Sequence, residues 1–510
     1  MSKLKNTIER LHVDWMLLVF LIGVTNVKLY VKAAVVLAYI AYLLYKKVSF
    51  PRRLPGVSPF YLFVLVAGTF SSLINGSFNV HGYWLGFVLG GAQWLIAGAA
   101  SYLLYIVVAS KDHKETEATI KAFFVINGIF CLYQIFQMAI LSGGHFPYWY
   151  WDASDQFGSS TGDHVRGVFG SNSLTNAAIN ILGALYFIYN KELRWAIFCA
   201  VIMMLCTSNM TLAFFVLTTI LMIVFAKQRA VKINALIVIV CMIVLYPILS
   251  PSNISYLRTT YHEKYLISDT LETADRGAAQ RHSTIIRSNN QELDYPAELM
   301  DMKYYATLHL KPNSNVALEQ GSIKYFLRRW YGYKDDEEMP PELKHMPVKV
   351  FSVKQVIDYN TSSLSHFVFG AGIGNFSSKL AIKMTGLGLQ GYYPPNYIYI
   401  SKDFFQYHFC TLLYVLSQPV SQHSIINMPF SVYGQLAGEY GLIGVIITII
   451  FYIGFFVKNR KYLSYGRYLW VPIAMYWGFE YWLEMISLMV IFELLMFSNI
   501  KAVKNDAVES

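Results

Sequence analysis

Long apolar runs alternate with short basic stretches along most of the chain. A helix of about 20 apolar residues is long enough to cross the hydrocarbon core of a bilayer. Twelve segments fit this pattern, and three of them are short enough to be tilted or re-entrant: 195–208, 211–226 and 468–481. The other segments are 11–27, 28–45, 57–74, 84–108, 119–141, 173–190, 233–250, 432–457 and 483–500. The pattern predicts an all-α polytopic membrane protein with about 12 transmembrane helices.

Two longer polar stretches interrupt the apolar runs. The shorter one, 142–172, precedes the sixth segment, and the longer one, 251–431, lies between the ninth and tenth segments. The longer stretch has enough residues to form a domain of its own. We therefore expect an N-terminal membrane domain over 1–250, a large loop domain over 251–431, and a C-terminal membrane domain with a tail over 432–510.

Composition indicates that the apolar segments lie in a membrane, and the distribution of charge predicts their orientation. Only 14% of the residues are charged, against about 25% in soluble domains, which excludes an ordinary cytosolic enzyme. Of the basic residues in short loops, 21 lie on one side and three on the other, namely Lys28, Lys32 and Arg166. The 17 basic residues of 251–431 are balanced there by 16 acidic ones. Basic loops stay in the cytoplasm, so both termini are predicted to be cytoplasmic. The large loop is predicted to be periplasmic, and the net charge of +10 indicates topology, not nucleic-acid binding.

Few charged residues lie deep in the apolar segments. Asp14 is close to a cytoplasmic end, Glu439 lies in the outer part of 432–457, and Glu493 is the deepest. A proton relay or ion path needs a series of charged groups across the membrane, and the sequence has none. The five cysteines show no CxxC spacing, so a structural zinc site is not expected. Chemistry is therefore expected at the outer interface.

Arg166 is the only basic residue of the loop 142–172 and lies just before the segment that begins near 173. A guanidinium at the membrane surface can bind a phosphate through two hydrogen bonds. Gly167 and Gly170 would let backbone amides approach the same anion closely. The alternative is an arginine that only anchors the loop to lipid headgroups.

His423, followed by Ser424, lies at the end of the large loop, close to the next apolar segment. An imidazole at a hydrated interface can act as a general base near neutral pH. The alternative is a histidine held in a structural hydrogen bond. Upstream, the glycine-rich run Phe369–Phe376 lacks the strand, helix and downstream acid of a dinucleotide site.

Three short elements thus follow one another in chain order, all on the predicted outer side. They are Arg166-Gly-Val-Phe169 with Asn172, then Phe369-Gly-Ala-Gly-Ile-Gly-Asn-Phe376, then His423-Ser424 with the helix start Glu439-Tyr-Gly441-Leu-Ile-Gly444.

In this order and topology the elements resemble the O-antigen ligase and polymerase family, which contains bacterial lipid-linked oligosaccharide transferases. The first is similar to an arginine-containing element that precedes a mid-chain span in that family. The second is similar to a Phe-Gly-x-Gly-x-x-x-Phe-like element within a large periplasmic loop. The third is similar to a histidine followed by a helix that begins Glu-x-Gly-x-x-Gly. The resemblance covers roughly residues 120–460.

The resemblance implies transfer of an oligosaccharide from a polyprenyl-diphosphate donor at the outer face of the inner membrane. His423 would be the general base, and Arg166 would stabilise the departing diphosphate. Relatives often carry a second phosphate-binding arginine after a short mid-chain span, but here Ser208 is followed by Asn209, so that arginine must come from elsewhere. The candidates in the large loop are Arg258, Arg276, Arg281 and Arg287, of which Arg258 is nearest the membrane in the sequence. The residues with an implied role in binding substrate are Asn172, Ser424, Glu439, Arg258, Gly372 and Gly374.

The implied partners are the lipid-linked donor, a glycan or lipid A-core acceptor, and membrane lipids. No metal or cofactor is implied, because arginine can neutralise the leaving diphosphate. Relatives place nine residues between the His-Ser pair and a Gly-x-x-Gly element, and if Gly441 and Gly444 are the counterparts, His423 lies seven residues too early. This divergence and the enlarged loop favour a polymerase of O-antigen or other surface polysaccharide repeat units. A ligase that joins the glycan to lipid A-core and an oligosaccharyltransferase that joins it to protein are the alternatives. A polysaccharide or lipid exporter without catalysis predicts internal repeats and a polar path across the spans, and the sequence shows neither.

Overall fold

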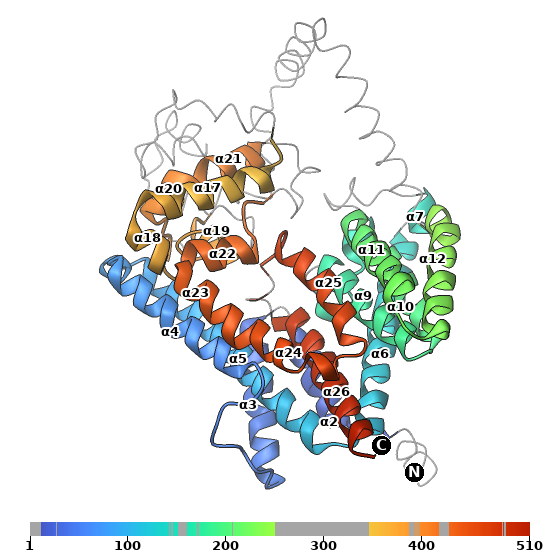
Figure 1. Cartoon of the computed structure of the whole chain (residues 1–510). Helices are drawn as coiled ribbons and strands as arrows, with labels where there is room; N and C mark the ends of the chain where they lie inside the picture. Colours follow the sequence, from blue (N-terminus) through green and yellow to red (C-terminus); the bar gives the residue numbers. More distant parts are fainter. Residues whose placement is uncertain are drawn as a thin grey trace, which may run out of the picture. The chain divides into compact units, whose positions relative to one another are not determined.

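The computed structural model describes residues 12–26, 28–141, 143, 146–150, 161–170, 173–206, 208–249, 346–386, 393–394, 397–417, 428–481, 483 and 486–509. Every regular element within these residues is a helix, and none of them is a strand (Figure 1). The prediction of an all-α protein is confirmed for the part of the chain that the structure describes.

A helix occupies each of the twelve apolar segments. The first nine are α2 (Trp15–Thr25), α3 (Leu29–Tyr45), α4 (Ser58–Ile74), α5 (Tyr83–Ser110), α6 (His113–Leu141), α9 (Ser173–Tyr189), α10 (Leu193–Leu205), α11 (Asn209–Phe225) and α12 (Arg229–Leu249). The tenth segment holds α22 (Val432–Glu439), α23 (Gly441–Ile447), a π-helix (Thr448–Ile453) and α24 (Gly454–Lys458), and the last two hold α25 (Gly466–Trp477) and α26 (Ile486–Glu509).

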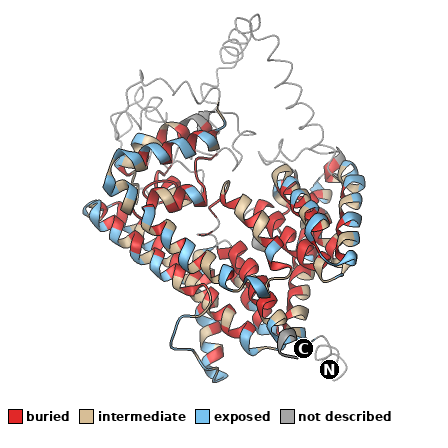
Figure 2. Cartoon of the chain, viewed as in Figure 1, coloured by how far each residue is buried: buried red, intermediate tan, exposed pale blue. Residues whose placement is uncertain are grey.

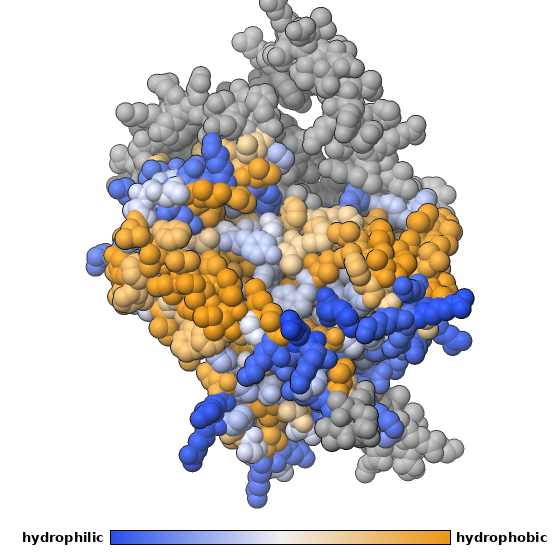
Figure 3. Space-filling view, viewed as in Figure 1, coloured by the Kyte–Doolittle hydropathy of each residue, from blue (hydrophilic) through white to orange (hydrophobic). Residues whose placement is uncertain are grey.

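Among the described residues, five helical stretches are long and apolar enough to cross a membrane, and six further apolar helices are shorter. The five are Tyr83–Ser110, His113–Leu141, Arg229–Leu249, Gly441–Lys458 and Ile486–Asn505. Their length and composition are those of a helical membrane protein. Large apolar side chains are exposed along α4 and α12, where a soluble protein would place polar ones (Figure 3). This exposure agrees with lipid as the surrounding medium.

The chain divides into two compact units. One contains Met1–Phe70, Leu89–Asn253 and Leu442–Ser510, and the other contains Ser71–Val88 and Ile254–Gly441. We call them the helical unit and the loop unit. The loop unit thus includes the end of α4 and the start of α5, in addition to most of the predicted loop domain.

The helical unit is built around α9, in which every residue from Ser173 to Ile188 is buried (Figure 2). The other strongly buried helix is α26, which carries Glu493. The Glu493 carboxylate accepts hydrogen bonds from the hydroxyl groups of Tyr61, at 2.6 Å, and Tyr452, at 3.1 Å. Tyr452 lies in the π-helix. The deepest acidic residue of the sequence is therefore hydrogen-bonded inside the protein, as a buried polar group in an apolar medium must be.

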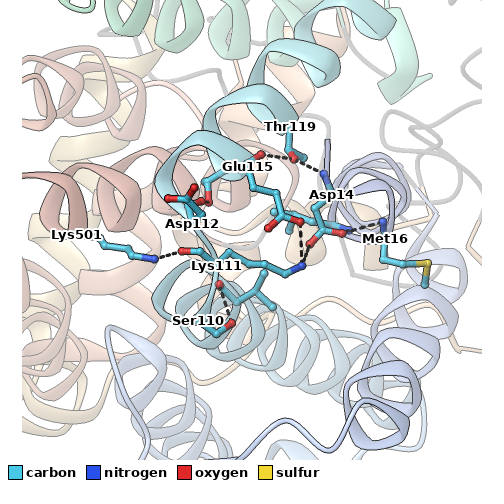
Figure 4. A network of polar contacts seen from close by, with 11 residues as sticks. Asp14, Met16, Ser110, Lys111, Asp112, Glu115, Thr119 and Lys501 are labelled. Carbon is cyan, nitrogen blue, oxygen red and sulfur yellow. Dashed lines mark hydrogen bonds and ion pairs between the residues drawn. The ribbon is translucent and has the colours of Figure 1, made fainter. Parts of the chain in front are cut away.

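A polar network fixes the start of α2 to the turn between α5 and α6 (Figure 4). Asp14 caps α2 by accepting the backbone N–H groups of Met16 and Leu17, and its other oxygen lies 3.1 Å from Lys111 Nζ. The backbone N–H of Asp14 donates to Thr119 Oγ1 at 2.9 Å. Carboxylates are stabilised at a helix N-terminus by the unpaired amide groups there. Asp14, which the sequence placed near a helix end, is thus a cap that joins three helices.

The loop unit contains α17 (Val348–Ser362), α18 (Leu364–Phe369), α19 (Lys379–Met384), α20 (Lys402–Tyr407), α21 (Phe409–Ser417) and α22. The residues at its centre are all aromatic or aliphatic, with Tyr359 and Phe376 stacked at 4.4 Å between ring centroids. Each of α18, α19, α20 and α22 begins at a serine whose side chain accepts a backbone N–H of the first turn. Serine is a favoured cap because its oxygen satisfies an otherwise unpaired donor.

The sequence predicts one span over 432–457, whereas the structure breaks this segment after Glu439. Gly441 has a φ of +61°, which favours glycine over residues with a side chain. A Cβ atom at Gly441 would lie 2.6 Å from the carbonyl oxygen of Val368 and 2.7 Å from the nitrogen of Gly370. The break therefore lets the backbone after α18 pass against the end of α22.

Candidate functional site

Four of the eight predicted site residues lie within the described residues. Arg166 belongs to the helical unit, while Gly372, Gly374 and Glu439 belong to the loop unit. The structure brings the last three together. The remaining four predicted residues lie outside the described residues: Asn172, Arg258, His423 and Ser424.

Arg166 lies in a short loop between α6 and α9 that is held by one glutamine. The loop contains two 3₁₀ turns, Thr161–His164 and Gly167–Phe169. The side-chain oxygen of Gln134, on α6, accepts the backbone N–H groups of Arg166 at 2.8 Å and Gly167 at 2.9 Å. The side-chain nitrogen of Gln134 donates back to the Gly167 carbonyl at 3.1 Å. One side chain thus fixes two successive peptide groups of the loop.

A row of buried asparagines extends this support into the helices. Asn127 accepts the backbone N–H of Val168 at 3.1 Å and donates to the Asn176 oxygen at 2.8 Å. Asn176 donates to the Val165 carbonyl at 3.1 Å, and Asn180 donates to the Asn176 oxygen at 2.9 Å. Amide side chains inside an apolar bundle are costly unless they are paired. Their pairing here spans α6, α9 and the loop, so these amides have a positioning role toward Arg166.

Gly167 lets the loop approach α6 closely. Its φ is +57°, and a Cβ atom there would lie 2.1 Å from Asn127 Oδ1. Gly170 also has a positive φ, of +68°, but a Cβ atom there would meet nothing within 4 Å. Of the two glycines that the sequence pointed out, Gly167 is therefore required by packing as well as by backbone conformation.

The guanidinium of Arg166 is held at one nitrogen. Its Nε–H donates to the Asp163 carbonyl at 2.9 Å, and within the described part of the chain Nη1 and Nη2 have no hydrogen-bond partner. Burial, and then the nearby Arg166 charge, lower the pKa of His164, while Asp163 opposes this shift. Arg166 is therefore fixed through its Nε, and its two terminal nitrogens can donate to a further group. A guanidinium of this kind can donate hydrogen bonds to an oxyanion, and it suits phosphate best.

In the loop unit, the glycine-rich run wraps around the carboxylate of Glu439. The Glu439 oxygens accept the backbone N–H groups of Gly374, Phe376 and Ser378 at 2.9, 3.1 and 3.0 Å. The backbone adds a bond from the Gly372 N–H to the Glu439 carbonyl at 2.8 Å. Three amides turned toward one anion hold it much as the successive amides of a nest do, and we call this arrangement the nest. The nest is occupied by a carboxylate of the same chain, so two of the predicted motifs are joined to each other.

Sequence reasoning missed a buried polar chain beside this nest. Ser377 Oγ lies 2.5 Å from His408 Nε2, and His408 Nδ1 lies 2.9 Å from Gln355 Oε1. An amide oxygen only accepts, so Nδ1 is the donor and Nε2 accepts from the serine. Burial lowers the pKa of His408 to about 3, so the ring is neutral.

The order serine, histidine and orienting amide is that of an activated nucleophile, but all three side chains are buried. A Cβ atom on Gly434, in α22, would lie 3.3 Å from Ser377 Oγ, so the helix covers the hydroxyl group. The hydrogen bonds among these three side chains hold together α17, the end of the glycine-rich run and the junction of α20 and α21. No spacing in the sequence signals it, because the three residues come from distant segments.

Within the described residues, no group of three histidine, cysteine, aspartate or glutamate side chains is placed to hold a metal ion. Comparison with known proteins gives no match: no family model, no curated protein and no solved structure matches this chain.

Proposed function

We propose that this chain transfers an oligosaccharide from a polyprenyl-diphosphate donor to an acceptor hydroxyl group, as a member of the O-antigen ligase and polymerase family. The proposed setting is the periplasmic face of the bacterial inner membrane. Both termini would be cytoplasmic, about 12 helices would span the bilayer, and 251–431 would form the periplasmic domain.

The observation that supports this proposal most strongly is that the loop carrying Arg166 is held in place by buried amide side chains. A loop fixed by Gln134 and Asn127 holds a guanidinium whose terminal nitrogens have no partner among the described residues. A lipid-anchoring arginine needs no such support, because headgroups are mobile and can follow the side chain. A catalytic cation gains from being fixed before the reaction, since no reorganisation is then needed as charge develops.

The proposed reaction is one substitution at the anomeric carbon of the donor. The acceptor oxygen forms a bond to that carbon, and the bond from the carbon to the diphosphate oxygen breaks. His423 takes the proton of the acceptor hydroxyl group, and the bonding electrons leave with the diphosphate. Arg166 stabilises the negative charge that develops there, and a donor of this kind contributes about 3–4 kcal/mol to lowering the barrier.

The other predicted residues would bind the two substrates. Arg258 would supply the second phosphate contact, and Asn172 and Ser424 would orient the reacting sugars. Gly372, Gly374 and Glu439 would act through the nest, which fixes the backbone that leads into α19. The proposed reaction uses no metal or cofactor.

The acceptor that we favour is a second lipid-linked repeat unit, which makes the protein a polymerase of surface polysaccharide. Transfer to lipid A-core would instead make it a ligase. Deleting the gene distinguishes the two in the cell of origin. Loss of a polymerase leaves lipopolysaccharide with single repeat units, whereas loss of a ligase leaves long chains on the lipid carrier.

The proposal is tested by transfer from a purified lipid-linked donor to an acceptor, with the full-length protein in nanodiscs. Arg166→Ala and His423→Ala should each lower the rate at least 100-fold, since about 3 kcal/mol of barrier corresponds to that factor. Arg229→Ala, in a cytoplasmic turn of the predicted topology, is the matched control for loss of an arginine and should transfer normally. Wild-type rates for both site variants would refute the assignment.

A further inference from the structure

Two lysines from distant parts of the sequence lie over the ring of one tyrosine in the helical unit. Tyr462 ends a 3₁₀ turn, Arg460–Tyr462, in the connection between α24 and α25. Lys461 Nζ lies 4.8 Å from the centroid of this ring, and Lys504 Nζ, on α26, lies 5.0 Å from the same centroid. An aromatic face attracts cations, so the ring gathers two positive charges at one place. We call Tyr462, Lys461 and Lys504 the Tyr462 cluster, and all three belong to the helical unit.

The connection that carries Lys461 is fixed to α26 by one asparagine. Asn499 Oδ1 accepts the backbone N–H groups of Ser464 at 3.0 Å and Gly466 at 2.9 Å. Asn499 Nδ2 donates to Ser464 Oγ at 2.6 Å. Because Asn499 and Lys504 lie on the same helix, these bonds also hold the two lysines of the Tyr462 cluster near each other.

The positive charges of this connection are not neutralised by a carboxylate among the residues that the structure describes. Lys461 and Lys504 are exposed and form no ion pair there, whereas the lysine in the network at the start of α2 is paired with two carboxylates. Arg460 and Arg467 add two more exposed cations. The Nε–H of Arg467 donates to the Ser464 carbonyl at 2.9 Å, which fixes this guanidinium to the same connection. Such a group of cations can bind an anion.

Two candidate membrane spans end beside the Tyr462 cluster. Gly441–Lys458 and Ile486–Asn505 are both long and apolar enough to cross a bilayer. Tyr462 follows the end of the first span shortly, and Lys504 lies at the end of the second. Since the connection is bonded to α26, both spans end at the same membrane surface. A lysine at the end of a span reaches the headgroup region, so the cluster lies at the level of the lipid phosphates.

We propose that the Tyr462 cluster binds the phosphate group of an anionic phospholipid. Basic residues gathered at the ends of membrane helices attract anionic headgroups. A free phosphate ion would meet the same cations, but the span that leads to the cluster also offers apolar surface to acyl chains. Its exposed apolar side chains are Ile446, Ile449, Ile450 and Val457. This combination of cations and apolar surface favours a lipid, and the inference does not depend on the proposed transferase activity.

Lipid binding can be measured by native mass spectrometry of the full-length protein in detergent, during titration with phosphatidylglycerol. The test variant is Lys461→Gln/Lys504→Gln, which removes both charges and retains polar side chains on the surface. The matched control is Lys46→Gln/Lys47→Gln, which removes two charges from exposed lysines at the end of α3. There Lys46 Nζ lies 5.9 Å from the centroid of the Tyr42 ring. Phosphatidylcholine and inorganic phosphate are the comparison ligands.

The dissociation constant of the first phosphatidylglycerol bound should rise at least tenfold in Lys461→Gln/Lys504→Gln and less than twofold in the control. Phosphatidylcholine, whose phosphate charge is balanced by choline, should bind the wild type at least tenfold more weakly. Equal losses in the two double variants would overturn the proposal, because the total charge of the protein would then govern binding. Displacement of the lipid by millimolar inorganic phosphate at constant ionic strength would also overturn it and indicate a soluble anion as the ligand.

A variant that keeps both charges separates loss of the site from a change in folding. Lys461→Arg/Lys504→Arg should bind phosphatidylglycerol as the wild type does, and binding as weak as that of the glutamine variant would contradict the role of the charges. The thermal midpoint of each variant must match that of the wild type. If the double glutamine variant fails this condition, Lys504→Gln alone replaces it and should weaken binding at least threefold.

Discussion

Replacing Gln134 by leucine should release the loop that carries Arg166. Leucine is similar in size to glutamine but cannot form hydrogen bonds. The substitution therefore removes three of them, two from the backbone N–H groups of Arg166 and Gly167 and one to the Gly167 carbonyl. These groups are half-buried, so each lost bond costs about 1 kcal/mol. The free energy of opening the loop should therefore fall by about 3 kcal/mol, which corresponds to a factor of about 100 in the opening equilibrium.

Amide hydrogen exchange of the protein in nanodiscs measures this equilibrium directly. The peptide that contains the Arg166 and Gly167 amides should exchange about 100-fold faster in Gln134→Leu, while peptides from α9 should be unchanged. Gln137→Leu is the matched control, because Gln137 is exposed on the same helix and, among the described residues, donates to Tyr133 alone. Unchanged protection of the loop in Gln134→Leu would show that the glutamine does not hold it.

Four further variants test the two glycines, the buried histidine and the nest. Gly167→Ala should lower the stability by about 2–4 kcal/mol, because it combines a positive φ with a clash against Asn127, whereas Gly170→Ala should cost only about 1 kcal/mol; equal thermal midpoints would contradict this. His408 is neutral in the folded protein and has its pKa lowered to about 3, so stability should be lost as the pH falls below about 6.5, by about 2 kcal/mol at pH 5. The His408→Gln variant should not show this loss of stability at low pH. The same dependence of stability on pH in the variant and the wild type would contradict the role of His408. Glu439→Gln offers one acceptor atom to three backbone donors and should lower the thermal midpoint through a loss of about 1–3 kcal/mol; a variant as stable as the wild type would show that the nest does not need the charge.

The pattern of apolar residues predicted where the helices are, because each run must bury its backbone polar groups in a helix when lipid surrounds it. It did not predict the break after Glu439. That break depends on the close approach of Gly441 to Gly370, which are far apart in the sequence. Nor did it predict that 71–88 joins the loop unit, since the hydrogen bonds that Ser71 and Asn75 donate after α18 are made to backbone carbonyls, which every residue has.

The candidate site was predicted in part. The sequence pointed to Arg166 because it is the only basic residue of its loop, and to the glycine-rich run and Glu439 through the order of the motifs. It did not point to Gln134, Asn127 or Asn176, because an amide in an apolar segment can face lipid, water or a partner, and only the fold decides which. That the Glu439 carboxylate binds the glycine-rich run itself also required the structure.

The most direct test of the account is to follow both products of one turnover with the purified wild-type protein. A donor labelled in the lipid and in the sugar is mixed with acceptor in nanodiscs, and free polyprenyl diphosphate and the new glycosidic bond are counted together. The account predicts one diphosphate lipid released for each glycosidic bond formed, with release lost in Arg166→Ala. Sugar that remains on its carrier, or carrier released without a new glycosidic bond, would contradict the claim that this protein is a glycosyltransferase.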